Sequence, residues 1–133
     1  MSLDPAALPA EVLDFLTERH LATLTTVRRD GTPHVVPVGF TYDATTRTAR
    51  VITSGDSVKA RLAGREGAVA AICQVDGARW LTVSGPIRVD DDPTVVADAV
   101  ERYAARYRQP RVNPLRVALI MDVDRMLGSS RLG

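Results

Sequence analysis

Short stretches of apolar residues, some strictly alternating with polar ones, recur along the chain and are separated by polar turns. The first two are rich in β-branched residues and flank a turn with Asp30-Gly31 at its centre. Two strands joined by an Asp-Gly turn are typical of a β-hairpin, and a second hairpin is predicted around Asp76-Gly77. Six strands are predicted in this way, at residues 21–27, 34–42, 48–54, 68–75, 78–89 and 115–123.

Helical spacing of apolar residues appears between these strands in three places. The first helix opens at Asp4-Pro5 or at Leu8-Pro9 and ends at His20, and a short second helix is capped by Asp56 or Ser57. The third begins at Pro93, and the two prolines of segment 108–114 end it. Its buried stripe is predicted at Val96, Val100 and Tyr103 or Ala104.

Six strands joined mainly by hairpins, with short helices at the periphery, predict a mainly β protein with a closed or nearly closed antiparallel barrel. Pro37 removes one hydrogen-bond donor from the second strand, so that segment is expected at an edge, a bulge or a ligand-facing opening. A dinucleotide-binding βαβ fold is not expected, because no G-x-G-x-x-G turn occurs.

Composition narrows the class of protein. The 133 residues suit a single domain spanning 1–133, and 45% apolar content suffices for one core. A formal net charge of +1 points to neither nucleic acid nor an anionic membrane as a partner, and no segment resembles a membrane span or a secretion signal. We therefore expect a cytoplasmic protein. Cys73, the only cysteine, sits in an apolar stretch and is expected to be an inert core thiol.

Few residues suit hydrolytic or metal chemistry. His20 and His34 are the only histidines, and their spacing does not match a pair of metal ligands. The acidic run 90–92 lacks the pattern of a calcium loop and is expected to be a solvated helix start. No metal site and no catalytic residue are predicted.

The segment 50–61 is richer in candidate chemistry. A strand ends in hydroxyl residues, turns at Gly55 and enters a helix whose first turn carries Ser57 and Lys59, the only lysine of the chain. Free N–H groups, a hydroxyl and a cation at a helix start suit a phosphate group. Asp56 argues against phosphate unless its carboxylate turns away to cap the helix. An ordinary capped surface helix remains the alternative.

Three segments together resemble the pyridoxamine 5'-phosphate oxidase-like superfamily of split β-barrels: HLATLTTVRRDGTPHVVPVGFTYD, ARVITSGDSVKARL and VDGARWLTVSGPIRV. The chain is most similar to its actinobacterial branch, which uses the deazaflavin coenzyme F420. The likeness covers nearly the whole chain. It implies a six-stranded antiparallel split β-barrel and hydride transfer from reduced F420 to a conjugated substrate, most closely biliverdin, which becomes bilirubin.

The resemblance also implies a homodimer with a cofactor in each of two clefts between the subunits. By position, Lys59 and Ser57 would hold the cofactor phosphate beside Thr53. A serine at position 57 departs from the flavin-binding oxidases, where a second cation is frequent, and this argues against FMN. The residues implied at the cofactor are Val36, Pro37, Val38, Ile52, Thr53, Ser57, Lys59, Gln74 and Trp80.

A second concentration of basic residues lies at Arg102, Arg106, Arg108, Arg111 and Arg116. Guanidinium groups suit carboxylates, so Arg79, Arg106 and Arg111 are candidates for the cofactor tail or the substrate, and Arg79 or a bound water is a candidate for the proton donor. A solvated helix face paired with acids such as Glu101 is the alternative. Two other functions stay open: an FMN-dependent oxidase-like enzyme and a non-catalytic binder of F420 or a tetrapyrrole.

Overall fold

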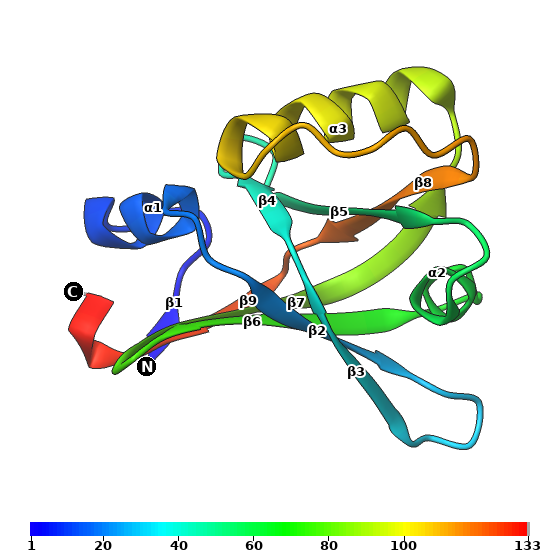
Figure 1. The fold of residues 1–133 in the computed structure, drawn as a ribbon. Helices are drawn as coiled ribbons and strands as arrows, with labels where there is room; N and C mark the ends of the chain where they lie inside the picture. The colour runs from blue at the N-terminus through cyan, green and yellow to red at the C-terminus, as the bar shows by residue number, and fades with distance from the viewer. Residues whose placement is uncertain (133) are drawn as a thin grey trace.

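The computed structural model describes residues 1–132 as one strongly twisted antiparallel sheet with helices around it (Figure 1). Seven strands follow the order β3-β2-β6-β7-β8-β5-β4, and β9 joins β7 to β1. The strands are β1 (Ser2–Leu3), β2 (Ala22–Val27), β3 (Pro33–Val38), β4 (Phe40–Asp43), β5 (Thr48–Ser54), β6 (Val69–Asp76), β7 (Arg79–Asp90), β8 (Arg116–Asp122) and β9 (Arg125–Gly128).

The strand β7 belongs to both halves of the sheet. Its first part pairs with β6 and β9, and its last residues, 87–90, pair with β8. Gly85 lies where the strand changes partners, and a Cβ there would be 2.0 Å from the carbonyl oxygen of Asp122. Only glycine permits this close approach, so it allows β7 to bend from one half into the other.

The three predicted helices are present: α1 (Ala10–Thr17), α2 (Val58–Ala63) and α3 (Pro93–Arg106). The helix α3 lies over β4, β5 and β8, whereas α2 packs at the other end of β5 (Figure 1). Pro9 is the N-cap of α1, and Asp92 caps α3 by accepting a hydrogen bond from the Thr94 N–H. Because α1 ends at Thr17, the prediction that His20 ends this helix is wrong.

The sheet is an open barrel, as the resemblance implied, but the expected number of six strands is too low. The segment 34–42 forms two strands, because Gly39 separates β3 from β4, and these two strands end the sheet path on opposite sides. The segment after the sixth strand, expected as a polar tail, forms β9 and a short 3-10 helix over 130–132. Their pairing with β1 and β7 joins residues far apart in sequence, which local patterns do not reveal.

The core fills the space between the two halves of the sheet. Its largest fully buried side chains include Phe15 of α1, Leu24, Phe40, Met121 and Met126. Cys73 is only half-buried, because its side chain lies on the outward face of the sheet beside Thr23. Among residues 1–132, no helix is long and apolar enough to cross a membrane.

Candidate functional site

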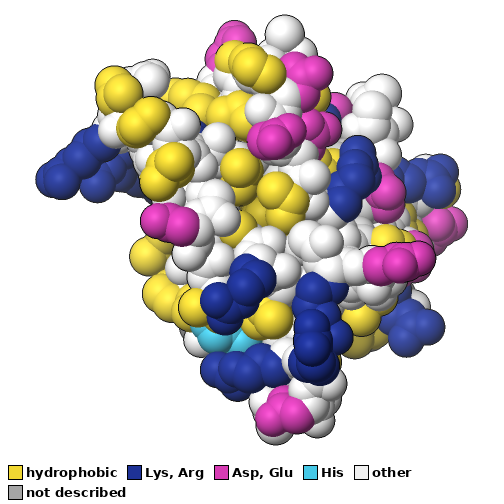
Figure 2. Space-filling model, turned by 90° about the vertical axis from the view of Figure 1, so that its right-hand side faces the viewer, with side chains coloured by type: hydrophobic (Ala, Val, Ile, Leu, Met, Phe, Trp, Pro, Cys, Tyr) yellow, Lys and Arg dark blue, Asp and Glu magenta, His cyan; other side chains and the backbone are white. Residues whose placement is uncertain are grey.

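A cavity of about 280 Å³ opens where the barrel fails to close, between the end of β3, the end of β5 and the loop before β8. Figure 2 shows the face of the molecule that includes α2, on which Lys and Arg side chains gather around hydrophobic and uncharged surface. The cavity is lined by Pro37, Val38, Gly39, Ile52, Thr53, Ser54, Lys59, Tyr103, Pro110, Asn113 and Arg116. Five of these residues were predicted from sequence: Pro37, Val38, Ile52, Thr53 and Lys59.

The start of α2 is capped by Ser57 and not by Asp56, and Ser57 itself is not among the residues that line the cavity. The Ser57 hydroxyl oxygen accepts hydrogen bonds from the Ala60 N–H and the Thr53 hydroxyl, both at 3.2 Å, which leaves its own proton free to donate. The Asp56 carboxylate accepts a hydrogen bond from the Ser54 hydroxyl at 2.6 Å and so has a partner of its own. Lys59 is half-buried on the cavity wall and has no ion-pair partner among residues 1–132.

Arg116 supplies a second cation to the same cavity. It opens β8 and pairs with Ser54 across the β5–β8 ladder, which places it beside the segment that leads to Lys59. Its guanidinium also donates a hydrogen bond to the Arg111 carbonyl oxygen. The cavity therefore has two cations although position 57 is a serine. The sequence argument against FMN rested on a missing second cation, so it does not hold. The sequence analysis placed Arg116 in the second basic concentration but not beside Lys59, because only the strand pairing brings the two close.

Gly39 forms the floor of the cavity between β3 and β4. A Cβ at this position would lie 2.9 Å from Tyr103 Cε2 and 3.1 Å from Tyr107 Cε2, so both tyrosine rings pack against bare backbone. The strand β3 is paired only with β2, which leaves its other edge free beside the cavity. The backbone at this edge can therefore hydrogen-bond a bound molecule.

Gln74 and Arg106 were predicted near the cofactor or its tail, and both are used inside the protein instead. Gln74 is fully buried, donates to the Phe15 carbonyl oxygen at 2.8 Å and accepts from Arg106. The Arg106 guanidinium also donates to the carbonyl oxygens of Glu18, at 2.7 and 2.9 Å, and of Phe40, at 2.6 Å. Because their polar groups are engaged within the protein, Gln74 and Arg106 hold the fold together. This corrects the predictions that placed them near the cofactor or its tail.

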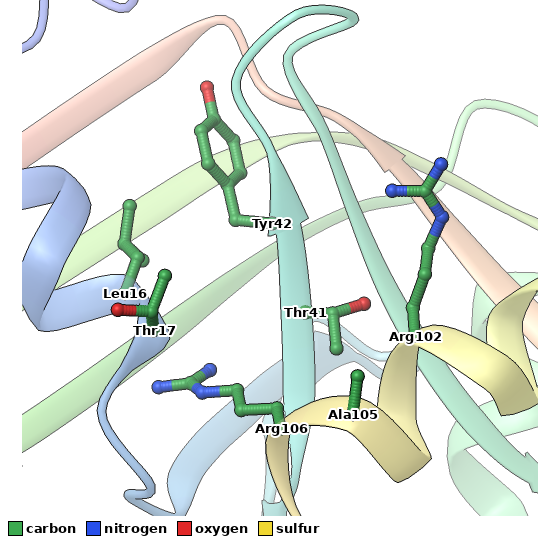
Figure 3. A pocket seen from close by; sticks show the side chains of 7 residues that line it. All are labelled: Leu16, Thr17, Thr41, Tyr42, Arg102, Ala105 and Arg106. Carbon is green, nitrogen blue, oxygen red and sulfur yellow. The ribbon is translucent and has the colours of Figure 1, made fainter.

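Arg106 lines a different cavity, of about 260 Å³, between α1, β4 and α3. Figure 3 shows Leu16, Thr17 and the Arg106 side chain on one side of β4, and Arg102 and Ala105 of α3 on the other. Arg102 is paired with Asp98 at 3.0 Å and with Asp43 at 3.5 Å, so this guanidinium is also neutralised.

The other predicted residues lie outside the cavity of their own chain. Arg79 bridges Asp76 and Glu18, with its nitrogens 2.9 and 3.1 Å from the Glu18 carboxylate oxygens. Trp80 is half-buried and bound through its backbone to Ser129, Val36 packs on the core, and Arg111 is exposed. Any contact of Trp80, Arg79 or Arg111 with a ligand stays a prediction.

Glu18, His20 and Asp76 form a cluster, and its contacts with Arg79 show whether it is a metal site or an ion-pair network. Their ligand atoms are close enough to surround a metal ion. The Arg79 guanidinium already occupies both carboxylates, and its hydrogen bonds lower the pKa of Glu18 from 4.5 to about 2. A neighbouring cation disfavours a metal ion, so we interpret the cluster as an ion-pair network that joins the end of α1 to the β6–β7 hairpin.

The family and the fold are shared with known proteins. Residues 8–129 match the family model described as "Pyridoxamine 5'-phosphate oxidase". An F420H(2)-dependent biliverdin reductase of Mycobacterium tuberculosis (strain CDC 1551 / Oshkosh) is 54% identical over 125 residues, which cover 94% of this chain and 90% of that protein.

Solved structures have the same fold. A structure described as an F420 reductase superposes with a TM-score of 0.73 at 25% identity, over 90% of this chain and 98% of that one. A conserved hypothetical protein of Mycobacterium tuberculosis superposes with a TM-score of 0.77 at 20% identity, over 92% of this chain and 84% of that one.

Proposed function

Because the chain belongs to the pyridoxamine 5'-phosphate oxidase family, whose open barrel it has, we propose that it is an F420H2-dependent reductase that converts biliverdin to bilirubin. The observation that carries the proposal is the 54% identity, over 94% of the chain, to an enzyme of that description. The cavity at the opening of the barrel is the proposed cofactor site. The choice of F420 over FMN depends on this relative and not on the number of cations.

The residues of the cavity fit a phosphorylated deazaflavin. Lys59 and Arg116 provide two positive charges for a phosphate group. The Ser57 hydroxyl is hydrogen-bonded to the lining residue Thr53 and would add a donor if the phosphate reaches the start of α2. The backbone of 37–39 would meet the flat ring system along the free edge of β3, with Ile52 on the β5 side. Gly39 keeps side-chain atoms out of this space. When bound, reduced F420 supplies the hydride that, with one proton, reduces the substrate.

The chain itself has to bind and orient rather than to act as a nucleophile. Within residues 1–132, the cavity lining includes no histidine, cysteine or carboxylate. Backbone N–H groups at the β3 edge would stabilise negative charge on the ring, as they do in other preorganised sites.

We also propose that the active form is a homodimer that meets through the outward face of β3, β2 and β6. Val35 is 54% exposed on this face, and Val69 and Val75 are 55% and 57% exposed. Apolar surface of this kind usually marks a protein–protein contact. Strand register aligns its side chains, all uncharged: Pro33, Val35, Pro37, Thr23, Thr25, Val27, Val69, Ala71, Cys73 and Val75.

The proposed dimer face adjoins the cofactor cavity. Pro37 lines the cavity and also pairs with Thr23 in the middle of the uncharged face. A second subunit on that face would therefore cover the mouth of the cavity and exclude water from it. This arrangement supports a cofactor site that is completed between two chains.

A titration followed by turnover tests the proposed function. The purified protein is titrated separately with F420 and with FMN, and the complex with reduced F420 is then mixed with biliverdin while the absorbance spectrum is recorded. Selective binding of F420 with conversion of biliverdin to bilirubin supports the proposal. Binding of F420 without turnover would point to a binding protein, and preference for FMN would point to an oxidase-like enzyme.

A further inference from the structure

Tyr103 lines both the cofactor cavity and a second cavity. The second cavity has a volume of about 370 Å³ and is lined by Arg19, Leu21, Tyr103, Tyr107 and Arg108. Tyr103 also lines the cofactor cavity, so one aromatic ring forms part of the wall of both spaces. A molecule in the second cavity would therefore lie next to a molecule in the first.

The two tyrosines differ in how firmly they are held. Their ring centroids are 4.9 Å apart with an angle of 34° between the planes, and both rings rest on Gly39. The Tyr107 hydroxyl donates to the His20 carbonyl oxygen at 2.7 Å and accepts from the Phe40 N–H at 3.2 Å. Tyr103 makes no such side-chain hydrogen bond within residues 1–132. Tyr107 is thus the fixed support, and Tyr103 presents a ring and a free hydroxyl.

The remaining walls combine apolar surface with positive charge. Leu21 is 65% exposed, although it is a large aliphatic side chain next to two aromatic rings. Arg19 and Arg108 are exposed and have no carboxylate partner among residues 1–132. Arg79, by contrast, is held by two acids nearby, so its guanidinium is not available to a ligand in the same way. Aromatic faces with unpaired guanidinium groups suit a flat conjugated molecule that carries carboxylates.

We propose that this second cavity is the substrate side of the site, where Tyr103 contacts the conjugated system of the substrate while Arg19 and Arg108 bind its carboxylates. The inference rests on the proposed function and deepens it by naming the residues that select the substrate. Biliverdin has the required chemistry, since it is a conjugated tetrapyrrole with two propionate groups. The cavity includes Leu21, at the border of the proposed dimer face, so a partner chain on that face would narrow it.

The test compares Arg19→Gln/Arg108→Gln with Arg29→Gln, a matched control at the exposed tip of the β2–β3 hairpin. Under saturating reduced F420, the double variant should raise the KM for biliverdin at least about fivefold, while kcat and the Kd for F420 stay within about twofold. The control should leave all three unchanged. An unchanged KM in the double variant, or an equal change in the control, would overturn the inference.

Two further measurements separate recognition from a structural effect. Biliverdin dimethyl ester, which lacks the charges, should bind the wild-type protein more weakly and should not respond to the arginine variants. Tyr103→Phe should keep the KM for biliverdin, whereas Tyr103→Leu should raise it, because the aromatic ring is the predicted contact. Wild-type protein that fails to turn over biliverdin contradicts the proposed function itself, whereas active wild-type protein with insensitive variants contradicts only the second cavity.

Discussion

Ser54 and Arg116 face each other across the β5–β8 ladder, so the first residue of β8 brings its guanidinium to the cavity at the end of β5. Lys59 and Arg116 are 57 positions apart in the chain, yet both line this cavity. The cation pair is thus a product of strand register and not of a local motif.

Removal of either cation should weaken cofactor binding. Lys59→Ala is expected to reduce the binding free energy of F420 by about 1.5 to 3 kcal/mol, the usual value of a charge-assisted contact, and Arg116→Gln by a similar amount. Fluorescence titration with F420 measures both. Arg131→Gln, an exposed arginine outside the cavity, serves as the control. Unchanged affinity in a folded Lys59 variant would contradict the phosphate assignment.

Gly39 should not accept a side chain. Gly39→Ala places a methyl group 2.9 Å from Tyr103 Cε2, and overpacking of this kind costs about 1 to 3 kcal/mol of folding stability. Urea unfolding measures the loss. Gly39→Ala/Tyr103→Ala should destabilise less than the two single changes together, because the closer of the two contacts is removed while the one with Tyr107 remains. If the double variant loses as much folding stability as the two single variants added together, the tyrosine rings do not restrict the side chain at position 39.

The Glu18–Arg79 pair predicts a pH-dependent stability. The pKa of Glu18 is about 2 in the folded protein against an ordinary 4.5, so the pair stabilises the fold fully above pH 4.5 and loses this effect as the pH falls towards 2. Arg79→Gln should therefore lower the Tm at neutral pH, and the difference from wild type should shrink between pH 4.5 and 2. The comparison variant is Arg88→Gln, which breaks a more exposed ion pair with Asp122. A Tm difference that does not change with pH would reject this role for Glu18.

The outward face of the sheet should carry the dimer. Val35→Glu puts a charge in the centre of that face and should convert a dimer to a monomer, as measured by light scattering after size-exclusion chromatography. F420 affinity should fall with it, because the mouth of the cavity would be uncovered. Val112→Glu changes a residue that is 97% exposed but lies in the loop before β8, and it should leave the oligomer intact. A Val35 variant that remains dimeric would place the interface elsewhere.

Local patterns predicted much of this fold because hairpins and capped helices depend on neighbouring residues. The Asp76-Gly77 turn, the Ser57 cap and the Pro93 helix start are all present. Strand β9 was missed because its partners, β1 and β7, lie far away in sequence. The division at Gly39 had a partial signal in the neighbouring Pro37, which already indicated an edge or an opening.

The candidate site was predicted less completely, and the arginines explain why. Arg106, Arg111 and Arg116 look alike in sequence, but Arg106 is saturated by carbonyl oxygens, Arg111 is exposed and Arg116 lines the cavity. Which groups surround a guanidinium depends on the tertiary packing. Gln74 shows the same limit, because only the folded chain places the Phe15 carbonyl oxygen and Arg106 on either side of its amide.

The two ends of the sheet path, β3 and β4, are consecutive in the chain and joined by Gly39 alone. The opening between β3 and β4 therefore follows from the order of the strands and does not depend on which side chains surround it. Because much of its lining near Gly39 is backbone, mutation can replace neighbouring residues and still preserve a slot for a flat ring. The same architecture is retained in a solved structure only 20% identical to this chain, so the fold tolerates replacement of most of its side chains.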